Sequence, residues 1–317
     1  MASVDLVDYC RPFVGWNSEW PSFPLKDDPQ IEWWRSWLDL TTPDCCWSQL
    51  QENLPQLLIP PVKDACKGDL YKRLVLQGSK PYLADFEAGL REPIDFDVNI
   101  KSHWSGSMPI IHIRNQGEFT QLLQCLAHRC EPTPIQQSVH SQVIGGLIHW
   151  GLIRSIDPSL RCKILVLHHS PYSSIPFHSV PGMDSANEWL RRSDIWRLEH
   201  ELIHVACKRL VGEMRLNLYD ELLADAIAMR VSLGYFDSKL FRITMGLDPD
   251  GYALESSRVH TYTKGLCNDN KIKAQKLVLE RAFELDELLS SSINGIDDIQ
   301  LLKILVSNQL DRKLQLP

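Results

Sequence analysis

Apolar and polar side chains alternate strictly along residues 94–101, which predicts a half-buried β-strand. Ile94, Phe96, Val98 and Ile100 form its apolar face. After the turn SGSMP, the run IIHIRN (110–115) predicts a second strand. The leucine-rich and β-branched run CKILVLHH (162–169) predicts a third.

Helical periodicity covers much of the remaining chain, so we expect a mostly helical α+β fold with a small sheet. One long helix starts near Asp184 or Ser185, and Gly212 is placed to end it. The other helices are expected at about 117–129, 134–150, 217–234, 270–292 and 297–312.

The first 60 residues are rich in tryptophan: Trp16, Trp20, Trp33, Trp34, Trp37 and Trp47. PQIEWWRSWLDL predicts a short helix, and a second is expected with Thr42 as its cap and Pro43 at its first position. We expect these indoles to pack the segment onto the body of the protein, with a peptide-binding aromatic platform as the alternative. The expected organisation is a packed segment, 1–60, on one compact domain, 61–317.

Composition excludes several classes of function. The chain has 317 residues, of which 44% are hydrophobic and 23% charged, with a net charge of −7. An acidic chain without basic patches gives no support to binding of nucleic acid or of an anionic membrane. The nine cysteines are odd in number and scattered, the N-terminus lacks signal-peptide features, and no apolar run reaches the ~18 residues of a membrane helix. We therefore expect a soluble cytoplasmic protein.

The stretch LEHELIHVACKRL (198–210) places His200, Glu201 and His204 in the pattern H-E-x-x-H. Residues four apart lie one helical turn apart on the same face, so both imidazoles can bind one metal ion. Zinc lowers the pKa of a bound water, and Glu201 is placed to take its proton as general base.

Catalytic zinc sites usually have three protein ligands, and the next helix offers the third. Asn217, Glu221 and Asp225 recur every four residues as a polar stripe on an otherwise apolar helix. Buried carboxylates need a partner, which a metal ion and its imidazoles would supply. We assign Glu221 as the third ligand, and Asp225 as the acceptor that holds a ligand histidine by its free N–H. Asn217 is the expected helix cap and is grouped with Asp225 as a supporting residue. Asp225 itself as the third ligand remains the alternative.

This motif pair, HELIH followed by ELLAD, resembles the gluzincin branch of the zincin metallopeptidases over residues 195–230. The resemblance implies a zincin-like α+β fold with a small sheet beside the metal-binding helix, and peptide-bond hydrolysis with Zn²⁺. It also implies that an edge strand before the metal helix binds substrate, and the segment from Cys162 occupies that place in the sequence. The chain differs in two respects: only sixteen residues separate His204 from Glu221, and Arg197 stands where zincins carry a small or β-branched residue.

A developing oxyanion needs a further hydrogen-bond donor. RVHTYTKGL offers His260 and Tyr262, which share one side if this segment is extended. The expected function is a zinc metallopeptidase that acts on a peptide or protein substrate. The alternatives are a catalytically inactive binding or regulatory protein on a zincin scaffold, and a zinc hydrolase of a non-peptide amide or ester.

Overall fold

The computed structural model describes residues 4–15, 19–291 and 295–315, so Trp16 lies outside the described residues. The chain divides into two compact units. The helical unit combines Met1–Ser22 with Ser170–Pro317, and the sheet unit is Phe23–His169. The expected boundary after residue 60 coincides with neither of these limits.

The sheet unit contains a four-stranded mixed sheet, which makes the fold α+β. Its strands are β1 (Phe96–Lys101), β2 (Met108–Ile113), β3 (Ser141–Leu147) and β4 (Cys162–His168), in the order β1-β2-β4-β3. β2 and β4 are parallel, and the two outer pairs are antiparallel. The three strands expected from the sequence are present, although Ile94 precedes β1 and is 92% exposed.

The prediction of a helix over residues 134–150 was wrong, because β3 occupies much of this segment. Gly145 and Gly146 weaken a helix, and Gly146 adopts a positive φ of 77° where the register with β4 shifts. The expectation that the segment from Cys162 forms an edge strand was also wrong. β4 is paired on both sides, by β2 and β3, so its backbone has no free edge for a substrate.

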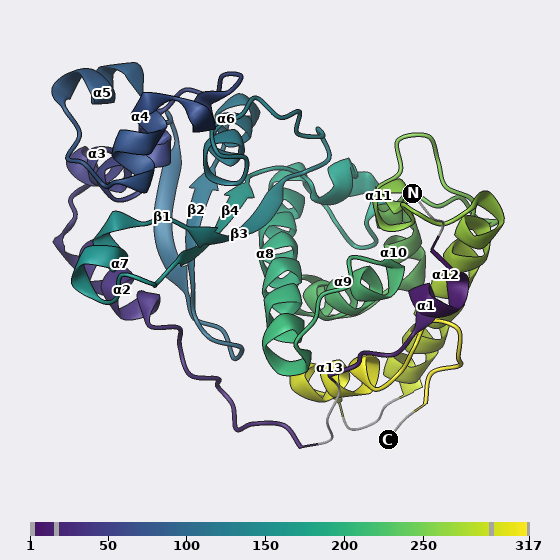
Figure 1. The fold of residues 1–317 in the computed structure, drawn as a ribbon. Helices are drawn as coiled ribbons and strands as arrows, with labels where there is room; N and C mark the ends of the chain where they lie inside the picture. Colours follow the sequence, from purple (N-terminus) through teal and green to yellow (C-terminus); the bar gives the residue numbers. More distant parts are fainter. Residues whose placement is uncertain (1–3, 16–18, 292–294, 316–317) are drawn as a thin grey trace. The chain divides into compact units, whose positions relative to one another are not determined.

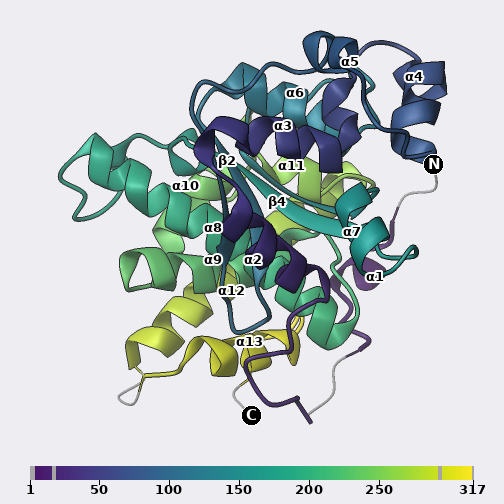
Figure 2. The same cartoon turned by 90° about the vertical axis from the view of Figure 1, so that its left-hand side faces the viewer.

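Helices of the sheet unit cover one face of the sheet with buried indoles. Trp34, Trp37 and Trp47 belong to the same buried cluster as Val98 and Ile111 of the strands. Figure 2 shows α2 in front of the strands, and its contacts with β1 and β2 place them side by side. These three indoles thus pack into the core, as expected. The helices are α2 (Gln30–Leu40), α3 (Pro43–Asn53), α4 (Asp69–Tyr71), α5 (Leu83–Ala88), α6 (Gln116–Leu126) and α7 (Trp150–Ser155).

In the helical unit, two long helices, α8 and α9, pack against each other (Figure 1). Ser185 caps α8 by accepting a hydrogen bond from the Glu188 amide, and Gly212 ends it in the left-handed conformation, as predicted. The helices of this unit are α1 (Leu6–Cys10), α8 (Ala186–Val211), α9 (Leu218–Leu233), α10 (Ser238–Met245), α11 (Val259–Tyr262), α12 (Asn268–Ser291) and α13 (Asp298–Val306). None of the helices in the described ranges combines the length and the apolar character that crossing a membrane requires.

Candidate metal centre

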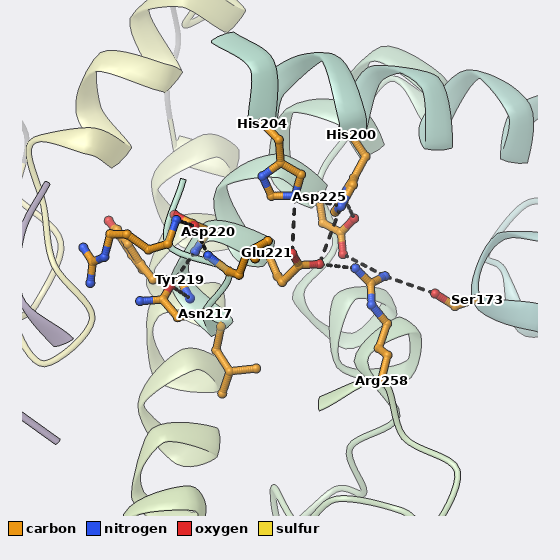
Figure 3. Close-up of polar contacts among 12 residues, drawn as sticks. Ser173, His200, His204, Asn217, Tyr219, Asp220, Glu221, Asp225 and Arg258 are labelled. Atoms are coloured by element: carbon orange, nitrogen blue, oxygen red, sulfur yellow. Dashed lines mark hydrogen bonds and ion pairs between the residues drawn. The ribbon is translucent and has the colours of Figure 1, made fainter. Parts of the chain in front are cut away.

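Three side chains from α8 and α9 converge in the buried interior of the helical unit. His200 and His204 project from α8 one turn apart, and Glu221 projects from the first turn of α9 (Figure 3). The two Nε2 atoms are 3.1 Å apart. Glu221 Oε1 lies 3.3 Å from His204 Nε2, and Oε2 lies 3.5 Å from His200 Nε2. All three side chains are less than a tenth exposed.

These separations fit a single metal ion. Ligand atoms placed tetrahedrally about 2.1 Å from an ion lie about 3.4 Å from one another. The two Nε2 atoms are 3.1 Å apart, and each lies 3.3 Å or 3.5 Å from one of the two Glu221 oxygens, which is close to that value; one donor atom of each residue lies within 4.8 Å of the others. Two imidazoles and a carboxylate are also a donor set that zinc accepts. The cluster of His200, His204 and Glu221 can therefore hold a metal ion.

Asp225 lies on the other side of the His200 ring from the three donor atoms. Its Oδ1 is 2.8 Å from His200 Nδ1 and accepts hydrogen bonds from Trp196 Nε1 at 3.0 Å and from the Tyr172 hydroxyl. Because Nδ1 is engaged here, His200 presents Nε2 to the cluster. Of the two residues that the sequence left as alternative third ligands, Glu221 lies in the donor cluster, whereas Asp225 contacts His200 Nδ1.

Arg258 completes the cluster, although no local sequence pattern pointed to this residue. Its Nη2 donates to Glu221 Oε2, and its Nη1 lies 3.5 Å from Asp225 Oδ2 (Figure 3). Nη1 also donates to the Tyr172 hydroxyl at 3.1 Å and to Ser173 Oγ at 3.2 Å. The guanidinium thus supplies the positive charge that two buried carboxylates require.

The charges of the cluster shift its pKa values. Burial alone would lower the pKa of His204, but the Glu221 carboxylate, helped by Glu201 and Asp220, outweighs it and raises that pKa to about 9. Burial alone would raise the pKa of Glu221, but its electrostatic interactions with His200 and with the Arg258 guanidinium hold it below its usual range. Without metal, the carboxylate is therefore ionised and His204 is protonated at neutral pH.

The short connection between α8 and α9 aims Glu221 at the histidines. Asp220 Oδ2 accepts hydrogen bonds from the backbone amides of Arg215 and Leu216, and these bonds fix the conformation of the turn. Asn217 caps α9 by accepting from the amides of Tyr219 and Asp220, and its Nδ2 donates to the Tyr9 carbonyl at 3.0 Å. The expected cap is therefore present. The expected support of a ligand is only indirect, because these bonds fix the start of the helix.

Of the two residues proposed as oxyanion donors, the structure brings one to the cluster. The segment forms the short helix α11 rather than an extended strand, so the two side chains point apart. Tyr262 interacts with Glu221, which together with burial raises its pKa, and Arg258 Cζ lies 5.6 Å from its ring centre. His260 is exposed and hydrogen-bonds to the Leu254 carbonyl at 3.0 Å. The expectation of an extended backbone in this segment was therefore wrong.

Two other α8 residues lie beside the ligands. Glu201 is half-buried, and its negative charge contributes to the raised pKa of His204. Arg197, the unexpected residue in the motif, is only 3% exposed. It donates to the Ser170 carbonyl at 2.8 Å and pairs with Asp194 at 3.3 Å, so its buried charge is compensated without using the metal ligands.

Comparison with known proteins identifies a family. No curated protein and no solved structure matches the chain. A family model described as "Family of unknown function (DUF7005)" matches residues 4–162 and 158–312, which together span nearly the whole chain. The chain therefore belongs to this family of unknown function.

Proposed function

We propose that the protein is a zinc-dependent hydrolase of the zincin type, with peptide bonds as its substrate. The observation that carries the proposal is the convergence of His200 Nε2, His204 Nε2 and the Glu221 carboxylate: the two Nε2 atoms are 3.1 Å apart, Oε1 lies 3.3 Å from His204 and Oε2 lies 3.5 Å from His200. A hydrogen-bonded carboxylate behind a ligand histidine is a recurring feature of zinc sites, and Asp225 supplies it. The sequence supports the same function, since in gluzincins the H-E-x-x-H helix is followed by a second helix that carries a glutamate ligand.

Two side chains beside the ligands then have defined tasks. A zinc ion held by His200, His204 and Glu221 would supply Lewis acidity, which would polarise a carbonyl group and make a water molecule more acidic. Glu201, next to His200 on α8, accepts the proton of the attacking water and returns it to the leaving amine. Asp225 holds the His200 tautomer whose Nε2 lone pair faces the cluster.

Tyr262 is the residue placed to stabilise an oxyanion. Its interactions with Glu221 and Arg258 hold it at the cluster, and its pKa is raised above the usual value by burial and by the Glu221 charge. The phenol therefore keeps its proton at neutral pH and can donate a hydrogen bond to a developing negative charge.

Metal content and turnover of three variants test this function. We expect the wild type to hold one zinc ion per chain and to cleave members of a broad peptide library. Glu201→Gln should keep the metal and lose cleavage, whereas His200→Ala should lose both. His178→Ala is the matched control, because His178 is an exposed histidine of the same unit outside the cluster.

The outcomes also separate the alternatives. Stoichiometric zinc without cleavage of peptides, amides or esters would favour an inactive binding or regulatory protein. Cleavage confined to small amides or esters would favour a non-peptide substrate. A wild-type protein that holds no transition metal after zinc is added would refute the proposal altogether.

A further inference from the structure

Both carboxylate oxygens of Glu221 face the imidazole pair. Oε1 lies 3.3 Å from His204 Nε2, and Oε2 lies 3.5 Å from His200 Nε2. A carboxylate in this orientation can bind an ion through one oxygen or through both. The difference matters, because a catalytic zinc site keeps one position open for water or substrate.

Arg258 engages one of these two oxygens. Its Nη2 donates to Glu221 Oε2, and its side chain is only 16% exposed. Nη1 is anchored by the Tyr172 hydroxyl at 3.1 Å and by Ser173 Oγ at 3.2 Å. The hydrogen bonds of Nη1 to Tyr172 and Ser173 therefore hold the guanidinium against Oε2. The other oxygen, Oε1, faces His204.

The loop that anchors Arg258 has an unusual backbone. Ser173 and Ser174 have φ values of 48° and 57°, in the left-handed region that L-residues rarely adopt. Such conformations persist only where the surroundings fix them, and they cluster at functional sites. Here the conformation is the one in which the Ser173 hydroxyl meets the guanidinium.

We propose that Arg258 is a positioning residue that reserves Glu221 Oε2, so that the carboxylate offers the metal a single oxygen and a position stays free for water or substrate. This inference rests on the proposed metal binding. It assigns to Arg258 a role distinct from general support of the fold.

The positive charge of Arg258 predicts the direction in which metal affinity changes when this residue is lost. The guanidinium lies beside both Glu221 and Asp225, so its removal leaves two buried carboxylates without their cation. A more negative site with both Glu221 oxygens available attracts a divalent ion more strongly. Loss of Arg258 should therefore preserve or increase metal affinity, whereas loss of a purely structural residue would loosen the site and weaken binding.

Visible absorption of the cobalt(II)-loaded full-length protein tests the proposal, because the geometry of the ion determines its spectrum. We expect an intense band of four-coordinate cobalt in the wild type. In Arg258→Met the band should weaken by about half or more, as a second carboxylate oxygen raises the coordination number. Cobalt affinity, measured by competition with a chelator, should be unchanged or higher. Ser173→Ala, a milder change that loosens the anchor, should shift the spectrum partly in the same direction.

Arg281→Met is the matched control. Arg281 is a buried arginine of the same unit, 2.8 Å from Glu284 and outside the cluster, so its loss should leave the cobalt spectrum as in the wild type. A wild-type spectrum in Arg258→Met, or weaker cobalt binding in that variant, would overturn the proposal while leaving the metal site intact. If Arg258→Met does not fold, an unshifted spectrum in Ser173→Ala overturns it instead. A wild type that binds no cobalt would remove the proposed function and this inference with it.

Discussion

His200 Nδ1 lies 2.8 Å from Asp225 Oδ1, and this contact joins α8 to α9 behind the cluster. A proton on Nδ1 leaves the Nε2 lone pair of His200 free, 3.1 Å from His204 Nε2. Asp225 is completely buried and accepts from Trp196 and Tyr172 at the same oxygen. The pair therefore fixes the orientation of one expected ligand before any metal arrives.

The Asp225–His200 contact predicts that Asp225→Asn weakens zinc binding about 10-fold to 100-fold, the usual cost of losing such a partner of a ligand histidine. The reason is loss of the negative charge that orients and polarises the imidazole. Competition with a chromophoric chelator measures the change. Asp286→Asn is the control, since Asp286 accepts from the Ser238 amide and hydroxyl, away from the cluster. Equal zinc affinities in Asp225→Asn and the wild type would contradict the assigned role.

The raised pKa of His204 predicts that metal affinity depends on pH. Below about pH 9 this imidazole carries a proton in the metal-free protein, and the proton must leave before Nε2 can bind. We expect zinc binding at pH 7 to release one proton, and the apparent affinity to fall about tenfold per pH unit below about 9. Calorimetric titrations in buffers of different ionisation enthalpy count the proton. Binding without proton release at pH 7 would show that His204 is already neutral.

Protonation of His204 should also affect the free energy of unfolding of the metal-free protein. Metal affinity rises with pH, whereas this contribution to stability falls. The pKa of His204 is raised from 6.5 to about 9 on folding. Its protonation therefore stabilises the folded state fully below about pH 6.5, and this contribution is lost as the pH rises through about 9. His204→Gln should flatten that part of the profile of unfolding free energy against pH, measured with denaturant. If the free energy of unfolding falls equally with rising pH in the wild type and in His204→Gln, His204 is not the cause of the fall.

Tyr262 and His260 offer a matched pair for the oxyanion role. Tyr262→Phe removes a hydroxyl at the cluster and should lower kcat about 10²-fold to 10³-fold, the cost of losing one oxyanion donor, with zinc content unchanged. His260→Ala should leave kcat as in the wild type, because His260 is exposed and bonded to the Leu254 carbonyl. Steady-state cleavage of a peptide found in the library screen provides the measurement. The assignment fails if Tyr262→Phe retains wild-type kcat.

Gly212 is predicted to matter through its backbone. It ends α8 with φ 78°, and a Cβ there would meet no atom within 4 Å, so replacement costs conformational strain alone. Gly212→Ala should lower the free energy of unfolding by about 1 kcal/mol. Gly212→Asn should cost less, because asparagine tolerates the left-handed region. Denaturant unfolding of the two variants checks this order, and a reversed order would contradict it.

The helical part of the candidate site followed from local patterns. His200 and His204 are four residues apart, and Ser185 and Gly212 limit their helix, so both imidazoles had to share a face. Spacing could not choose between Glu221 and Asp225, because both lie on one stripe of α9. The choice depends on where α9 crosses α8, which brings Glu221 to the two Nε2 atoms and Asp225 to His200 Nδ1.

The parts that the sequence did not predict depend on tertiary contacts. Arg258 lies 37 residues after Glu221 and carries no local motif; only the need of two buried carboxylates for a cation hinted at such a residue. Tyr172 likewise reaches Asp225 from the short 3-10 helix Tyr172–Ser174. β3 was predicted as a helix because pairing with β4, rather than local propensity, determines its conformation.

Anomalous X-ray diffraction at the zinc edge, from crystals grown with added zinc, locates the ion itself. We expect one strong peak per chain, within about 2.0–2.2 Å of His200 Nε2, His204 Nε2 and a Glu221 oxygen. Crystals that show no peak at this cluster, or zinc bound only by other side chains, would contradict the proposed metal site.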